Sequence, residues 1–470
     1  MTPSGVRPSG RSHRVERGFA LLAAVVLVLS VVAAVTIPTQ ATRDKGIAFD
    51  ADVPDEYSFT PPTDAGTATV DGESFDSVQA AVDAADPGDT VVLSGIFEER
   101  VVVDTPDVTL TSAPGPMALI NGTGEGDVLT LNGENVTLDR VWVSNSGYKA
   151  ENNDAAIWVN GTNATIANSR VTEMTFGIWI DGVNDVLVEN NTIVGRERVR
   201  PLSYRGNGIQ LWKTEGTFVD GNRITDVRDG LYYSWASNVD ARGNTMWDLR
   251  YGVHYMYSDS CELSDNVAFD NDVGYALMVS EDLSIHDNVA VNNSGTSGHG
   301  LLLERIDHSS IRDNTFVANR KGLYVFNSVN NTIVENLVLS NDVGVHVAAG
   351  SFRERVYGNS FIHNKRPLVA VVSAKQLTWN ATDRQYGNYW DTARTSDADN
   401  DGVSEIRYRP SGLVEWLTQQ HPQALVFANS PAFDAIRMAE SSFPVIESPG
   451  VIDYYPLTRP NHEDWREYYE

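Results

Sequence analysis

The sequence predicts an all-β protein, a right-handed parallel β-helix with coils of about 22 residues. A glycine that opens an apolar-x-apolar strand recurs from Gly208 to Gly344 at spacings of 22, 22, 22, 26, 22 and 22 residues. Strand-forming residues dominate each repeat, and no helical periodicity occurs inside it. A second marker, asparagine two residues before an apolar side chain, keeps almost the same spacing and occurs at Asn222, Asn244, Asn266, Asn288, Asn314, Asn336 and Asn359.

The N-terminal residues 1–38 carry an export signal. Residues 1–18 are basic and are predicted to stay in the cytoplasm, whereas 19–38 hold the apolar run Phe19–Ile37. That run fits either a cleaved signal peptide or a transmembrane anchor. The basic flank remains inside in both cases, so the rest of the chain is expected outside the cytoplasm.

Two short regions precede the coils. Residues 39–70 are polar and without periodicity, and we expect them to form a tether. Residues 71–89 are predicted to form a helical cap, because Val78, Ala81, Val82 and Ala85 fall on one helical stripe that Pro87-Gly88 ends. A cap would cover the apolar core and the unpaired strand edge at the open end of a solenoid.

The β-helix is expected over residues 90–380. Alternation of side chains puts the first and third residues after each glycine inside, and the second and fourth outside in two exposed columns. The asparagines are predicted to stack as a structural amide ladder. Cys261 aligns with Val239 and Leu283, which predicts a buried thiol and not a ligand.

Two insertions interrupt the period at the same corner, just before a glycine strand. They span Gly195–Arg205, which is rich in arginine, and Asn293–His299. At the strand spacing of a β-sheet, the two loops lie roughly 19 Å apart and should flank the face between them.

The C-terminal residues 381–470 are predicted to hold an acidic loop and a helical cap. Asp397, Asp399, Asp401 and Glu405 have the spacing of a calcium loop, although the EF-hand's twelfth-position glutamate is missing. A plain Asp-Gly turn is the alternative. Two helices, Leu413–Gln420 and Pro431–Glu440, should cover this end of the coils.

The outward columns contain a candidate metal site. His254 and Met256 share one face of a strand, and Met278 lies one coil further. One imidazole and two thioethers favour soft Cu(I) over hard cations. His299 is a further candidate, whereas His346 is four coils from His254, too far to share an ion.

The alternative interpretation of this face is an apolar patch for a protein partner. The side chains that we expect to contact a partner, on this face or on the first loop, are Trp212, Tyr232, Trp235, Glu304, Phe326, Arg196, Arg198 and Arg200.

Composition limits the possible partners. Asp and Glu number 63 against 35 Lys and Arg, a net charge of -28, which disfavours nucleic acid and favours solubility in salt. Many parallel β-helices cut or epimerise acidic polysaccharides, which requires a base beside cationic groups. Such a lyase or epimerase is the alternative function here, although the outward columns lack paired carboxylates.

Several motifs in order resemble the NosD family, accessory proteins for the maturation of nitrous oxide reductase. They are GVHYMYS at Gly252–Ser258, GYALMVS at Gly274–Ser280, GLLLERID at Gly300–Asp307, GNYWD at Gly387–Asp391, the DADNDGVSE loop and YRPSGLVEWL at Tyr408–Leu417. The resemblance implies a pectin-lyase-like solenoid that is not itself an enzyme.

The resemblance also implies a function outside the cell membrane. Members handle Cu(I) transiently for assembly of the copper centres of nitrous oxide reductase. They work with an ABC transporter ATPase/permease pair, in which ATP is hydrolysed, and with a membrane-attached copper chaperone. His254, Met256 and Met278 fall in the HYM and LM motifs of this family.

Overall fold

The computed structural model describes residues 46–54, 57–370, 376–427, 430–442 and 450–469. The predicted export segment, residues 1–38, lies outside these ranges. Within them no helix is long and apolar enough to cross a membrane. Residues Ile47–Glu470 form one compact unit.

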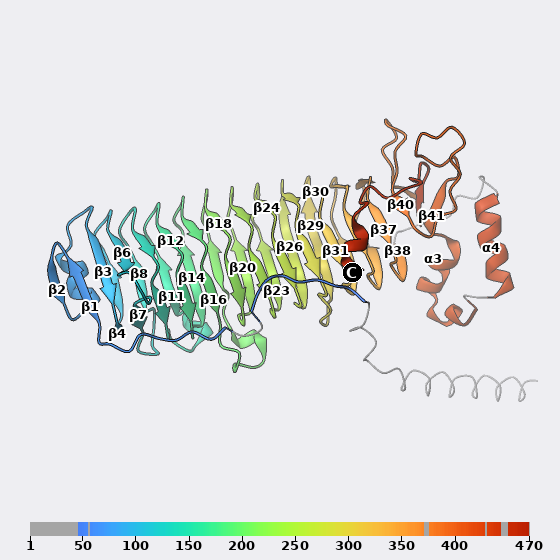
Figure 1. Ribbon diagram of the computed structural model, residues 1–470. Helices are drawn as coiled ribbons and strands as arrows, with labels where there is room; N and C mark the ends of the chain where they lie inside the picture. The colour runs from blue at the N-terminus through green and yellow to red at the C-terminus, as the bar shows by residue number, and fades with distance from the viewer. Residues whose placement is uncertain (1–45, 55–56, 371–375, 428–429, 443–449, 470) are drawn as a thin grey trace, which may run out of the picture. The chain divides into compact units, whose positions relative to one another are not determined.

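The coils stack into three parallel sheets, which confirms the predicted β-helix (Figure 1). Among the described residues, the sheets contain 14, 13 and 12 strands. Sheet 1 consists of β1 (Thr67–Val70), β2 (Glu73–Phe75), β3 (Thr90–Ser94), β6 (Thr109–Ser112), β9 (Thr137–Asp139), β12 (Thr165–Ala167), β15 (Leu187–Glu189), β18 (Phe218–Asp220), β21 (Asp240–Arg242), β24 (Glu262–Ser264), β27 (Ser284–His286), β30 (Ser310–Arg312), β33 (Thr332–Val334) and β36 (Arg355–Tyr357).

Sheets 2 and 3 follow sheet 1 around each coil. Sheet 2 consists of β4 (Ile96–Glu98), β7 (Leu119–Asn121), β10 (Trp142–Ser144), β13 (Arg170–Thr172), β16 (Thr192–Val194), β19 (Arg223–Thr225), β22 (Thr245–Trp247), β25 (Val267–Phe269), β28 (Val289–Val291), β31 (Thr315–Val317), β34 (Leu337–Leu339), β37 (Ser360–Ile362) and β40 (Tyr389–Trp390). Sheet 3 consists of β5 (Val101–Val103), β8 (Leu129–Leu131), β11 (Ala155–Val159), β14 (Phe176–Asp181), β17 (Ile209–Trp212), β20 (Asp229–Ser234), β23 (Tyr251–Met256), β26 (Val273–Glu281), β29 (His299–Asp307), β32 (Lys321–Phe326), β35 (Val343–Val347) and β38 (Arg366–Ala370).

The repeated glycine allows adjacent coils to approach closely. A Cβ built on Gly274 would lie 2.7 Å from the carbonyl oxygen of Gly300, which is closer than real contacts allow. The first and third residues after the glycines of β17 to β35 are at most 2% exposed, as alternation predicts. Cys261 is likewise buried, and burial raises the pKa of its thiol to about 12.

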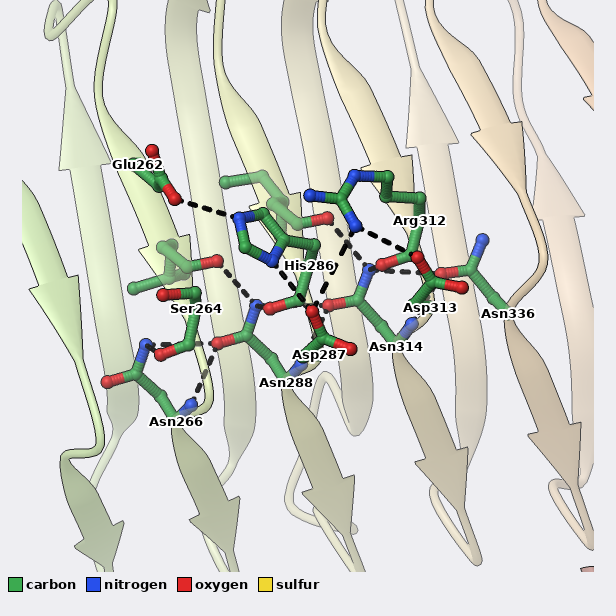
Figure 2. Close-up of polar contacts among 12 residues, drawn as sticks. Glu262, Ser264, Asn266, His286, Asp287, Asn288, Arg312, Asp313, Asn314 and Asn336 are labelled. Atoms are coloured by element: carbon green, nitrogen blue, oxygen red, sulfur yellow. Dashed lines mark hydrogen bonds and ion pairs between the residues drawn. The ribbon is translucent and has the colours of Figure 1, made fainter.

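The predicted asparagine ladder is present (Figure 2). The backbone nitrogen and Nδ2 of Asn266 donate to Oδ1 of Asn288, at 3.1 and 3.0 Å, and Asn288 repeats both bonds to Asn314. The ladder ends where Asn388 donates to the buried carboxylate of Asp453. A second ladder, which we did not predict, stacks Asn271, Asn293, Asn319, Asn341 and Asn364.

The first coil is flanked by a hairpin and a helix. Strands β1 and β2 form an antiparallel hairpin that we did not predict. Helix α2 (Val78–Ala84) buries the predicted stripe, and Ser77 caps it. The carboxylate of Glu99 also accepts from the backbone nitrogen of Val78 at 2.7 Å.

The C-terminal part holds a small sheet and two helices. Strands β39 (Gln376–Thr378), β42 (Gly450–Asp453) and β41 (Tyr408–Ser411) pair in that order. Helices α3 (Leu413–Gln420) and α4 (Pro431–Ser442) form where we expected them, and η3 (Pro422–Phe427) links them. Their capping of the coils stays a prediction.

The described part of the predicted tether, residues 39–70, packs against the β-helix. Along residues 47–54 and 57–60 every second side chain is partly buried, and the aromatic ones among them pack against the outer face of sheet 2 (Figure 1, blue). The ring of Phe49 lies 5.8 Å from that of Phe269, and the ring of Tyr57 lies 5.9 Å from that of Trp247. We call the described residues between 47 and 64 the strap. The strap is polar on average, but its few aromatic side chains pack against sheet 2 and hold it there.

The C-terminal tail covers the rest of the same face. The aromatic residues of η4 (Trp465–Tyr469) pack against Val317, Leu339 and other apolar side chains of sheet 2. The strap and the tail meet where the nitrogen of Ala48 donates to the oxygen of Tyr468 at 2.8 Å. These two segments of the chain therefore occupy much of the outer face of sheet 2.

Both predicted insertions lie at the corner between sheets 2 and 3. One connects β16 to β17 and contains η2 (Leu202–Tyr204); the other connects β28 to β29. A third insertion at this corner, between β10 and β11, contains η1 (Ala150–Asn152) and was not predicted. The first and third loops touch, because the Arg196 guanidinium lies 3.8 Å from the Tyr148 ring centroid.

Replacement of Asn288 by alanine should lower the free energy of unfolding by about 3 kcal/mol. The change leaves two buried donors of Asn266 without their acceptor. Equilibrium urea unfolding measures the loss. Asn160→Ala is the matched control, since Asn160 forms an amide contact with Asn132 but is exposed. Equal effects in both variants would contradict a special role of the ladder.

The double variant Tyr57→Ser/Phe59→Ser should detach the strap and cost about 3 kcal/mol of stability through lost apolar burial. Phe59 packs against Trp142 at 5.7 Å and under the guanidinium of Arg170 at 4.5 Å. We expect faster limited proteolysis within the strap and a lower Tm. Phe218→Ser is the control, because Phe218 is 49% exposed. An unchanged cleavage rate would show that the strap does not depend on these rings.

Candidate metal centre

The predicted copper ligands lie together on the outer face of sheet 3. Met256 of β23 pairs in register with Met278 of β26, and His254 lies two residues before Met256. On the N-terminal side, β20 places Tyr232 beside His254 and Ser234 beside Met256. One imidazole and two thioethers therefore occupy two adjacent coils, midway between the insertions before β17 and β29.

The outward columns are more buried than we predicted. His254 is only 8% exposed, Gln210 3% and Ala276 0%, while both methionines are half-buried. The reason is a third column, the residue before each glycine, which also points outward. In this outer layer Tyr251, Met278 and Tyr324 pack over Val273, Ala276 and Leu302. The site is thus partly covered by neighbouring side chains and is not an open surface.

A buried aspartate orients His254. Asp229 is 0% exposed, and its Oδ2 lies 3.2 Å from His254 Nδ1. The same carboxylate accepts from Arg250 Nε at 2.8 Å and Nη2 at 2.5 Å. Burial alone would raise the pKa of Asp229, but the hydrogen bonds from His254 and Arg250 lower it overall. Asp229 is therefore an ionised acceptor.

The ionised carboxylate determines which imidazole nitrogen is free. A carboxylate can only accept, so Nδ1 of His254 carries a hydrogen, and in the neutral form of the ring Nε2 is the nitrogen that holds the lone pair. Nε2 is buried and has no hydrogen-bond partner among the described residues. A neutral imidazole held by a carboxylate on its other nitrogen is the usual arrangement of a metal ligand.

Two tyrosines flank the imidazole. The rings of Tyr232 and Tyr251 meet His254 edge to face, with centroids 4.7 and 5.1 Å away. Burial raises the pKa of both phenols, so they stay protonated at neutral pH. They exclude water from the imidazole and add no charge.

Sequence reasoning missed Asp229, Arg250 and Tyr251. Asp229 and Tyr251 belong to the third column, immediately before Gly230 and Gly252, and Arg250 precedes Tyr251. The predicted strands began at the glycine, whereas β20 and β23 begin one residue earlier. Simple alternation would have placed Asp229 inside with Leu231 and Tyr233, so the contact of Asp229 with His254 depends on the three-dimensional structure.

The residues expected to contact a partner differ in accessibility. Arg196 cannot serve, because it is 3% exposed and donates inward to the carbonyl oxygens of Ser146, Gly147 and Glu173. Arg198 and Arg200 remain exposed, with Arg198 paired to Glu173. Trp235 is 57% exposed and stacks on Tyr257 at 4.7 Å. The half-buried members are Trp212, Tyr232, Glu304 and Phe326.

The acidic loop brings three of its four predicted ligands together. The carboxylate oxygens of Asp397, Asp399 and Asp401 lie within 4.8 Å of one another. Glu405 is outside this group and accepts from the backbone nitrogen of Ala398 at 2.8 Å. Calcium binding here stays a prediction.

Comparison with known proteins agrees with the fold and with the motifs. The family described as "Periplasmic copper-binding protein (NosD)" matches residues 190–395. Two curated relatives carry the name "Probable ABC transporter binding protein NosD". The Pseudomonas aeruginosa protein is 36% identical over 84% of this chain and 93% of its own length. The Stutzerimonas stutzeri protein is 35% identical over 78% and 86%.

A solved structure shares the architecture. The A-module of the Azotobacter vinelandii mannuronan C-5 epimerase AlgE6 aligns with a TM-score of 0.52 and 14% identity, over 63% of this chain and 91% of the module. At that identity the likeness concerns the parallel β-helix alone. The sequence identity to two curated relatives over most of their length goes further, and it shows that this chain belongs to the NosD family.

Proposed function

We propose that this protein receives Cu(I) outside the cytoplasm at His254, Met256 and Met278 and passes it on for the copper centres of nitrous oxide reductase. The single observation that carries the proposal is the buried Nε2 of His254, which has no hydrogen-bond partner among the described residues. Asp229 orients the ring through its other nitrogen, Nδ1. Membership of a family described as periplasmic and copper-binding supports it.

The donor set suits a cargo ion that must leave again. Thioethers bind soft Cu(I), carry no charge and need no deprotonation. With one neutral imidazole, they hold the ion without a thiolate, so its transfer to a partner requires no change of protein charge. The only cysteine of the chain, Cys261, is buried in the core and does not compete.

The partners follow from the family. The relatives are named as ABC transporter binding proteins, and we propose that an ABC transporter ATPase/permease pair and a membrane-attached copper chaperone work with this chain. The half-buried Glu304 and Phe326, which continue the methionine column on the next coils, would lie where such a partner approaches the ion.

A polysaccharide lyase or epimerase is the second candidate, because Asp229, His254 and two tyrosines could form an acid-base site. Three observations disfavour it. Arg250 is engaged with Asp229 and is not free to neutralise a uronate. The tyrosines have raised pKa values and are poor bases. Met256 and Met278 contribute nothing to proton transfer. Release of unsaturated sugars from uronate polymers would favour this candidate.

The double variant Met256→Ile/Met278→Ile should weaken Cu(I) binding by at least about a hundredfold, since it removes two of three ligands. Anaerobic titration with a competing chelator measures the Kd. Met246→Ile is the control, because Met246 lies inside the coil and is 0% exposed. Equal Cu(I) affinity of the double variant and the unsubstituted protein would show that Met256 and Met278 are not ligands.

Asp229→Asn should weaken Cu(I) binding about 10- to 100-fold without removing a ligand. The amide keeps an acceptor for Arg250, but its NH₂ group faces Nδ1 of His254 and drives the hydrogen to Nε2. Nitrogen-15 chemical shifts of His254 report the tautomer in the copper-free protein. Asp220→Asn is the control, since it breaks a surface pair with Arg242. An unchanged tautomer together with unchanged affinity would contradict this role of Asp229.

A further inference from the structure

A second set of imidazoles lies on the outer face of sheet 3, on later coils than the metal centre. Tyr324 of β32 is their common neighbour. The ring of His299, on β29, stacks on it with centroids 4.9 Å apart and planes 20° from parallel. The ring of His346, on β35, meets it edge-on at 4.9 Å. Lys321 Nζ lies 4.7 Å from the same ring centroid.

Each of these histidines has an unused nitrogen. His299 is only 5% exposed, and its Nδ1 is buried without a hydrogen-bond partner among the described residues. The same holds for Nε2 of His346. Buried polar atoms are normally paired, and each exception requires an explanation. Two unpaired imidazole nitrogens beside the same tyrosine ring indicate that a ligand from outside the protein binds here.

The surrounding charges are positive in a protein of net charge -28. In the part of the chain that the structure describes, no carboxylate forms an ion pair with Lys321 or Arg366. Arg366 lies in register two coils beyond Lys321, through Val343. The third cation, Arg320, donates to the carbonyl oxygens of Gly295 and Thr296 and holds the loop before β29 against this corner.

These cations distinguish this site from the copper centre. Burial lowers the pKa of His299 to about 3 and that of His346 to about 4, and Lys321 adds to both effects. His254 instead faces a buried carboxylate. A metal cation would be repelled by Lys321 and Arg366, whereas an anion would be attracted. Burial raises the pKa of Tyr324, and the carboxylate of Glu304 adds to this effect.

We propose that His299, Lys321 and His346, with Arg366 at the rim, bind the anionic oxygens of a phosphate or carboxylate group. The ammonium group and the N–H groups of neutral imidazoles donate charge-assisted hydrogen bonds to such a ligand. The proposal is independent of copper binding, because it uses none of His254, Met256 or Met278. Tyr324 fixes the rings, and the strands fix their spacing.

The test is a titration of histidine-labelled protein, followed by NMR at constant ionic strength. One arm adds inorganic phosphate, and the other adds a hexaglutamate peptide as the carboxylate probe. We expect saturable shifts of the His299 and His346 resonances, assigned with single His→Gln variants, while the exposed His421 stays unchanged. Tighter binding of phosphate or of the peptide identifies the source of the anion.

Lys321→Met should weaken binding about tenfold, the effect of one charge-assisted hydrogen bond. Lys365→Met is the matched control, because Lys365 is exposed and already paired with Asp342 at 2.9 Å. Circular dichroism checks that both variants fold. No saturable shift with either probe would overturn the proposal, and so would equal affinity of the Lys321→Met and unsubstituted proteins.

Discussion

The structure depends on one constraint, the close in-register stacking of coils. Strands of neighbouring coils hydrogen-bond at about 4.8 Å, so equivalent positions must tolerate copies of themselves directly above and below. Glycine satisfies this where carbonyl groups approach a Cα, as at Gly274 and Gly300. Asparagine satisfies it at the corners, because one amide both donates to the next residue and accepts from the previous one. The same stacking places Met256 beside Met278, although 21 residues separate them in the sequence.

The faces of the β-helix have different roles because the chain covers them differently. The strap and the C-terminal tail bury much of the outer face of sheet 2 and meet at Ala48 and Tyr468. Sheet 3 has its own outer layer of side chains, and His254 within it is 8% exposed. Partners of this protein therefore have better access to sheet 3, where the donor atoms are, than to the sheet that the strap and the tail cover.

Three histidines on sheet 3 show how nearby charges determine whether an imidazole suits a metal cation or an anion. His254 donates through Nδ1 to a buried carboxylate, and its Nε2 has no hydrogen-bond partner among the described residues, which suits a metal cation. His299 and His346 lie among lysine and arginine side chains and a tyrosine, which suits an anion. All three imidazoles lie on the outer face of the same sheet, on β23, β29 and β35. Their difference comes from which residues precede the glycines of adjacent coils, Asp229 in one case and Lys321 in the other.

The β-helix, its register, the inward residues, the asparagine ladder and the grouping of His254 with two methionines all follow from the amino-acid sequence. Periodicity suffices for these, because every coil repeats one local rule. The strap, the second ladder, the burial of Arg196 and the bond from Asp229 to His254 depend on the three-dimensional fold. They join segments with no common period, such as Tyr57 with Trp247, or lie one residue outside the strand we inferred. A repeat predicts contacts between equivalent positions, whereas contacts between unlike positions depend on how the whole chain folds.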